Sequence, residues 1–126
     1  MPPLTLEQLD AYFLSKTGAE ASYPFGEGTR VYKVLGKMFG LIGEDADPLR
    51  VNLKCDPDDA LALRRQYEAV TPGYHMNKQH WNSLYMDGSL PVSLVHELID
   101  HSYALVVARL SQARQRKLEA MRKGHI

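Results

Sequence analysis

Residues 70–82 of the chain, VTPGYHMNKQHWN, hold a high density of side chains that are able to bind a ligand or transfer a proton. The segment contains the only tryptophan of the chain and two of its five histidines. Recognition groups concentrate on loops that a rigid scaffold supports, so this segment is the first candidate for a functional site. The candidate ligand-binding residues in it are Tyr74, His75, Asn77, Lys78, His80 and Trp81.

Catalysis finds little support among these residues. His75 and His80 have side chains that titrate near neutral pH and can act as acid and base. The serines lack a G-x-S-x-G context, and the glycines match neither a phosphate-binding loop nor a dinucleotide fingerprint. Cys55 alternates with apolar strand residues and is expected to be a buried hydrophobe. We therefore expect no enzyme activity and no cofactor, and keep a reaction at the two histidines as a third hypothesis.

A metal site is also not expected. His96 and His101 stand in the sequence HELIDH, which resembles the zinc signature that places histidines four residues apart on a helix. Here the spacing is five residues, which puts the two imidazoles about 140° apart around the helix axis. Ion pairs or hydrogen bonds one turn apart on the helix surface are the better explanation.

A second group of candidates lies on the predicted strands. Arg50 and Lys54 alternate with the apolar residues Val51 and Leu53, and two lysines lie in the preceding predicted hairpin. If these strands pair, one face of the sheet gathers four cations and no acid, namely Lys33, Lys37, Arg50 and Lys54. Cations beside aromatic residues suit phosphate contacts and base stacking, which makes DNA a candidate partner. Lysines on an outer sheet face also serve solubility alone.

Composition limits the alternatives further. A chain of 126 residues with 44% hydrophobic residues is expected to form one domain. The single cysteine excludes an intramolecular disulfide and suits a reducing compartment. The N-terminal residues show no signal-peptide pattern, and no run of apolar residues is long enough to span a membrane. We therefore expect a cytoplasmic protein that has no membrane contact.

The charges balance overall, with 15 basic and 15 acidic residues, but they are unevenly distributed. After Leu110 the chain holds five cations and one acid, so we divide it into a body, residues 1–110, and a basic C-terminal extension, residues 111–126. The composition of the extension fits a projecting helix and a frayed tail equally well. Its charges suit contact with nucleic acid, although such runs are more often simply solvated.

The expected elements follow from caps, turns and periodicity. A capping box at Thr5 and Gln8 begins a helix that runs to about Thr17, and Asp56 with Pro57 begins another. Strands are expected near residues 19–23, 30–35, 37–42, 50–55 and 81–86, and a long helix after Pro91. Neighbouring strands without regular βα alternation predict a two-layer α+β domain, an antiparallel sheet with helices mainly on one face.

Six blocks of sequence together resemble the MmcQ/YjbR family. They are YPFG (23–26), VYKVLGKMFGLI (31–42), VNLKCDP (51–57), VTPGYHMNKQHWN (70–82), DGSLP (87–91) and ELIDHSYALVVARL (97–110). The resemblance implies an α-β(3)-α-β(2)-α order, similar to type III secretion chaperones and to the frataxin-like arrangement. Members of this family are commonly labelled as DNA-binding, on the basis of a fold comparison with a double-wing motif.

Two classes of function follow. The first is a small binding protein that contacts DNA through the basic sheet face and the 70–82 loop. The alternative is a protein-interaction or chaperone-like module, alone or as a dimer, that binds no nucleic acid. The near-zero net charge argues against strong nonspecific DNA binding, whereas the uneven placement of charge is compatible with a local basic patch.

Overall fold

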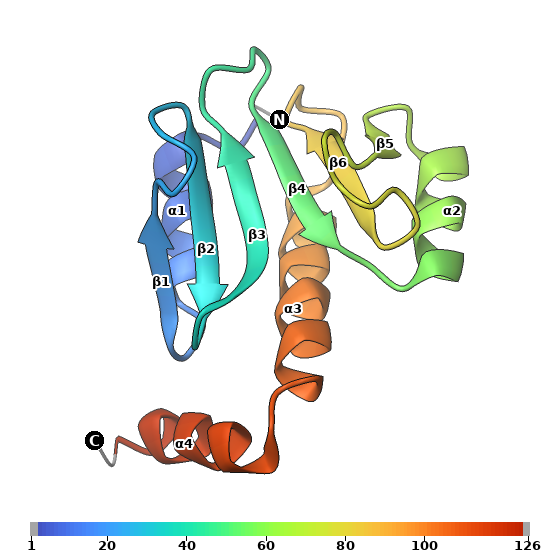
Figure 1. Cartoon of the computed structure of the whole chain (residues 1–126). Helices are drawn as coiled ribbons and strands as arrows, with labels where there is room; N and C mark the ends of the chain where they lie inside the picture. Colours follow the sequence, from blue (N-terminus) through green and yellow to red (C-terminus); the bar gives the residue numbers. More distant parts are fainter. Residues whose placement is uncertain (1–2, 125–126) are drawn as a thin grey trace.

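Six strands and four helices form the computed structural model of this chain, which describes residues 3–124 (Figure 1). The helices are α1 (Leu6–Leu14), α2 (Pro57–Gln66), α3 (Val92–Ala108) and α4 (Gln112–Arg122). The strands are β1 (Ala19–Ser22), β2 (Thr29–Val34), β3 (Lys37–Gly43), β4 (Arg50–Lys54), β5 (Val70–Pro72) and β6 (Trp81–Tyr85). Helices α1 and α3 cover one face of the sheet, α2 flanks its β5 edge, and α4 crosses its lower end (Figure 1).

The strands form one antiparallel sheet in the order β1-β2-β3-β4-β6-β5. The predicted two-layer α+β class is therefore confirmed. Four strands precede α2, rather than the three that the family resemblance implied, because β1 pairs with β2 from Ala19↔Val34 to Ser22↔Val31. The sheet face opposite α1 and α3 is called the open face below.

The core between the sheet and the two covering helices is built around Phe13 of α1. Its ring stacks on Tyr32 of β2 at a centroid distance of 4.1 Å, and both residues are fully buried. Gly40 of β3 allows this approach, because a Cβ atom at that position would lie 2.3 Å from the Phe13 ring. The packing of α1 thus depends on one glycine in the middle of the sheet.

A β-bulge shapes β3 where α3 crosses it. The register between β2 and β3 shifts at Tyr32 and Lys33, so that Phe39 has no direct partner in the β2 ladder. Ser102 of α3 satisfies the free carbonyl of Phe39 by donating a hydrogen bond of 2.5 Å from its hydroxyl. The same hydroxyl accepts a hydrogen bond from the Lys54 backbone amide at 2.9 Å. One buried serine therefore links α3 to two strands.

The start of α1 agrees with its predicted capping box, in which the Thr5 hydroxyl accepts from the Gln8 amide and the Gln8 side chain accepts from the Thr5 amide. The helix ends at Leu14, earlier than the predicted Thr17. Ser15 explains the difference, because its hydroxyl donates to the Tyr12 carbonyl at 2.6 Å and competes with further helical hydrogen bonds.

The C-terminal extension forms α4 and packs on the body. Leu118 is buried and lies against Gly18, between α1 and β1. Gln115 donates hydrogen bonds to the Leu110 and Val107 carbonyls at the end of α3. The composition of the extension allowed a projecting helix or a frayed tail. The extension forms a helix, and this helix packs against the body of the protein.

Candidate functional site

Three cations converge at the lower end of the molecule, where the β2–β3 hairpin, β4 and α3 all end. Lys37, Lys54 and Arg109 line a hollow of about 290 Å³ together with apolar side chains from β3 and α3. Two residues with positive φ, Leu35 (46°) and Gly36 (83°), form the hairpin turn that places Lys37 there. The three side chains come from separate elements, and only the fold brings them together.

The electrostatics of this hollow favour an anion. Among residues 3–124, none of the side chains that line it is acidic, and none of its three cations forms an ion pair. Burial, with the nearby Arg109 guanidinium as the second cause, lowers the pKa of the Lys54 ammonium. A phosphate or carboxylate in the hollow would offset the repulsion between these cations.

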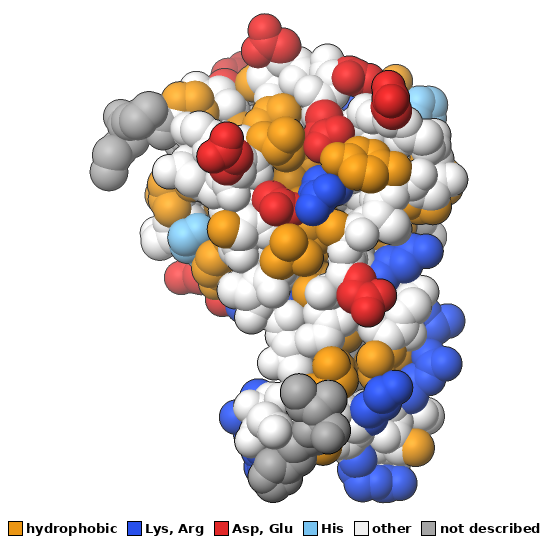
Figure 2. All heavy atoms as spheres, turned by 90° about the vertical axis from the view of Figure 1, so that its left-hand side faces the viewer, with side chains coloured by type: hydrophobic (Ala, Val, Ile, Leu, Met, Phe, Trp, Pro, Cys, Tyr) orange, Lys and Arg blue, Asp and Glu red, His pale blue; other side chains and the backbone are white. Residues whose placement is uncertain are grey.

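Helix α4 adds further positive charge beside the hollow. Arg114 donates a hydrogen bond to the Leu35 carbonyl at 3.2 Å, which ties α4 to the β2–β3 turn. Figure 2 shows Lys and Arg side chains gathered around the lower end, whereas Asp and Glu predominate toward the upper end. We call this region, formed by Lys37, Lys54, Arg109 and Arg114, the basic end.

The expectation that four cations share one sheet face is corrected by the register. Lys37 pairs with Val34 and therefore shares the side of the sheet on which Val34 is buried, whereas Lys33 pairs with Met38 on the open face. Arg50 stands at the opposite end of β4 from Lys54. The structure thus brings Lys37 and Lys54 together, keeps Lys33 nearby and separates Arg50 from all three.

Arg50 lines a second hollow, on the open face, with a volume of about 310 Å³. Tyr74 and His75 of the 70–82 loop line it too, and the Arg50 guanidinium lies 4.6 Å from the centroid of the Tyr74 ring. Phe25 of the β1–β2 loop, 71% exposed, contributes to its rim. We call this space the open-face hollow.

Two of the remaining loop candidates make hydrogen bonds that hold the loop itself. The Asn77 side-chain oxygen accepts a hydrogen bond of 2.9 Å from the Gln79 backbone amide. The Asn77 backbone carbonyl accepts a hydrogen bond of 2.9 Å from the Trp81 backbone amide. The Lys78 ammonium donates to the Gly73 carbonyl at 3.0 Å. These contacts give both side chains a structural role.

His80 and Trp81 lie where the loop enters β6. The His80 carbonyl accepts a hydrogen bond of 2.8 Å from the Cys55 amide. Trp81 is partly buried and pairs directly with Lys54, so its side chain emerges beside that cation. The candidate residues of the loop therefore have three different locations. Some line the open-face hollow, some make hydrogen bonds within the loop, and some lie beside the basic end.

Two residues that line the hollows, Arg109 and Phe25, were not among the candidates predicted from the sequence. Arg109 carried no signal, because it follows the apolar stripe of a long helix and its meeting with Lys37 depends on the tertiary fold. Phe25 stands in the YPFG block, where a turn is closed by a hydrogen bond of 3.1 Å from the Gly26 amide to the Tyr23 carbonyl. A bulky apolar residue at the tip of such a turn was a usable signal.

The α3 histidines serve different neighbours. His96 stacks on Tyr12 of α1 at a centroid distance of 3.8 Å, and His101 accepts a hydrogen bond of 3.4 Å from the Asp56 amide. Within residues 3–124, no group of three or more His, Cys, Asp and Glu side chains is placed to hold a metal ion.

Burial raises the pKa of the Cys55 thiol to about 11, which disfavours the nucleophilic thiolate.

None of the helices in the described part of the chain is long and apolar enough to cross a lipid bilayer.

Comparison with known proteins places the chain in a family. The family model YjbR matches residues 14–105. The protein YjbR of Escherichia coli K12 is 36% identical over 115 residues, which cover 91% of this chain and 98% of that protein. The protein YbdF of Escherichia coli O157:H7 is 38% identical over 99 residues, covering 79% of this chain and 81% of that protein.

Two solved structures have a fold similar to that of this chain. The crystal structure of Deinococcus radiodurans protein DR2400, a DUF419 domain, has a TM-score of 0.87 at 34% identity and covers 94% of this chain and 91% of its own. A Pseudomonas syringae protein, structural genomics target PsR293, has a TM-score of 0.71 at 25% identity and covers 81% of this chain and 98% of its own. The match to the family model and the identity to these relatives show that the chain belongs to the YjbR family.

Proposed function

We propose that the protein binds DNA through phosphate contacts at the basic end and has no catalytic role. The observation that carries this proposal is the convergence of Lys37, Lys54 and Arg109 on one hollow that has no acidic lining residue in the described part of the chain. Such a cluster suits phosphate oxygens, because proteins that neutralise phosphates release counterions and gain affinity from this.

Neighbouring elements extend the cluster into a surface. Arg116 and Lys117 are exposed cations of α4, the helix that Arg114 ties to the β2–β3 turn, and they are candidates for further phosphate contacts. On the other side of the cluster, Trp81 stands next to Lys54 in the β4–β6 ladder and supplies an aromatic ring beside a cation. An aromatic side chain in this position is suited to stacking on an exposed base. The proposal therefore moves the contact surface from the open sheet face to the lower end of the molecule.

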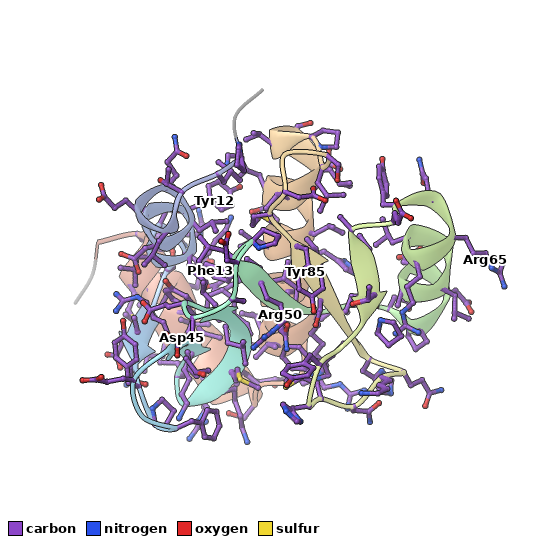
Figure 3. All side chains as sticks on the ribbon, turned by 90° about the horizontal axis from the view of Figure 1, so that it is seen from above. Tyr12, Phe13, Asp45, Arg50, Arg65 and Tyr85 are labelled. Carbon is purple, nitrogen blue, oxygen red and sulfur yellow. The ribbon has the colours of Figure 1, made fainter. Side chains whose placement is uncertain are left out.

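The test is a binding titration with a short fluorescently labelled DNA duplex at low salt. The triple variant Lys37→Ala, Lys54→Ala, Arg109→Ala should bind about tenfold more weakly, if each contact contributes roughly 0.5 kcal/mol. Arg65→Ala is the matched control, because Arg65 is an exposed cation that projects outward from α2 (Figure 3). Equal affinity of the triple variant and the control would reject the basic end as the DNA site.

A protein-interaction module is the second candidate, favoured by exposed aromatic residues on the β1–β2 loop. Phe25 is 71% exposed and Tyr23 is 42% exposed. If a second copy of the chain covers them, sedimentation velocity should show a concentration-dependent dimer that Phe25→Ser abolishes. A monomer at all concentrations would reject self-association through this loop.

A further inference from the structure

The open-face hollow is lined by two kinds of side chain. Met38, Leu41, Met76 and Phe25 form apolar walls, and Arg50 supplies the only charge among the lining residues that the structure describes. Its volume of about 310 Å³ lies at the small end of the range for ligand pockets. The hollow adjoins the basic end, because Met38 lines both, but its cation lies away from that end, since Arg50 and Lys54 stand at opposite ends of β4.

Arg50 forms no ion pair with any residue that the structure describes. Its Nε atom is buried and has no hydrogen-bond partner within residues 3–124. Gly43 leaves room for the guanidinium, because a Cβ atom there would lie 2.7 Å from an Arg50 nitrogen. The ring of Tyr74, from the 70–82 loop, lies beside the guanidinium.

Buried polar groups fix the loop that forms one wall. The Asn52 amide donates to the Tyr74 carbonyl at 3.1 Å, and the Ser83 hydroxyl accepts from the Tyr74 amide at 2.9 Å. Ser83 also donates to Asn52 at 2.7 Å, and both residues are buried. This pair holds Tyr74 in place beside Arg50 before any ligand arrives.

The next residue is held in an unusual backbone conformation. His75 has a φ of 58°, in the left-handed region that residues other than glycine seldom adopt. Its ring lies 4.0 Å from the Tyr74 ring, at the edge of the hollow. Strain of this kind persists where the surrounding structure enforces it, and it often accompanies a binding site.

We propose that the open-face hollow binds a small aromatic carboxylate. The planar guanidinium of Arg50 matches a carboxylate in shape and charge. A single cation suits a monoanion, and the apolar walls suit an aromatic ring that the methionines and Phe25 can contact. The carboxylate would give the Arg50 side chain the counter-charge that no ion pair within residues 3–124 supplies.

The test is an NMR titration of the wild-type protein with 4-hydroxybenzoate and indole-3-acetate, each paired with its neutral amide. We expect saturable shifts at residues that line this hollow and not the basic end, among them Leu41, Arg50, Tyr74 and His75, and binding of the amides weaker by about tenfold or more. Arg50→Gln should weaken acid binding by a similar factor, whereas Arg109→Ala, at the basic end, should leave it unchanged.

Three outcomes would overturn the proposal. They are the absence of saturable shifts at millimolar concentrations, shifts that map to the basic end, and equal binding of acids and amides. The acid and amide comparison uses only wild-type protein, so it decides the question even if Arg50→Gln does not fold. DNA titrations of Arg50→Gln keep this site distinct from the proposed function, because that variant should bind DNA as the wild type does.

Discussion

Buried polar residues of this protein are almost all matched to a specific partner. Asn82 donates to the Ala60 carbonyl at 3.3 Å and accepts from Arg64 at 2.7 Å, and Ser102 joins α3 to β3. Within residues 3–124, the Nε of Arg50 is the one buried side-chain nitrogen or oxygen without a partner. Because an unmatched buried donor costs free energy, this exception draws attention to the open-face hollow.

The glycine under Phe13 provides a test at the scale of one residue. Gly40→Ala should lower the free energy of unfolding by about 1–3 kcal/mol, because its Cβ would press on a fully buried ring. Gly43→Ala is the control, since its Cβ would meet only the end of the Arg50 side chain. Urea unfolding measures both, and a loss for Gly40→Ala no larger than that for Gly43→Ala would contradict the packing argument.

The carboxyl of Asp100 should make stability depend on pH. Burial alone would raise its pKa, but hydrogen bonds from Lys16 and Tyr12 outweigh burial and hold the pKa below its usual value. A carboxyl of this kind stabilises the fold above its unfolded-state pKa, and this contribution is lost as the pH falls through its folded-state pKa. Asp100→Asn should therefore cost stability near neutral pH and cost progressively less below about pH 4.

The size of this effect is limited, because 47% of the Asp100 side chain is exposed. We expect a loss of less than about 1 kcal/mol near neutral pH. Urea unfolding at several pH values measures it, and Lys16→Gln should reduce the same pH dependence. A stability difference between Asp100→Asn and the wild type that stays constant down to acidic pH would show that the Lys16 contact contributes nothing.

At the scale of elements, α3 is the helix that organises the sheet. It reaches β3 and β4 through Ser102, and α1 through the stacking of His96 on Tyr12. Its last turn ends at the basic end, where Arg109 meets Lys37 and Lys54. The position of α3 against the bulge in β3 therefore sets the geometry of the proposed DNA site.

Ser102→Ala should lower the free energy of unfolding by about 1–3 kcal/mol, because it leaves the Phe39 carbonyl and the Lys54 amide without their buried partner. Ser93→Ala is the matched control, since Ser93 is an exposed residue of the same helix. Thermal and urea unfolding of both variants measure the difference. Equal stabilities would mean that the bulge does not need this hydrogen bond.

The sequence predicted the positions of the helices and strands better than it predicted the sheet face on which each side chain lies. Caps and alternation located α1, α2 and the central strands, because those signals are local. The alternation in β4 correctly buried Val51 and Leu53. It could not show that the turn at Leu35 and Gly36 puts Lys37 opposite Val34, nor that a loop residue, Tyr74, covers Arg50. The first depends on the exact length of the hairpin turn, and the second on a contact between segments far apart in the sequence.

At the scale of the whole molecule, the charges are unevenly placed on the face that Figure 2 shows. Acidic residues predominate at the upper end and basic residues at the lower end (Figure 2), although the net charge is zero. Within α4, Arg122 and Lys123 lie against Glu119, and Arg114 bonds to the Leu35 carbonyl. Arg116 and Lys117 are therefore the α4 cations best placed for phosphates, fewer than the five that the sequence offered.

The salt dependence of DNA binding tests the central claim most directly. Each phosphate contact adds about −0.9 to the slope of log K against log salt concentration. The triple variant Lys37→Ala, Lys54→Ala, Arg109→Ala should therefore bind with a slope shallower by about 2.7 than that of the wild type, while Arg65→Ala keeps the wild-type slope. A triple variant with the wild-type slope, or a wild-type protein without measurable DNA affinity at low salt, would contradict the account.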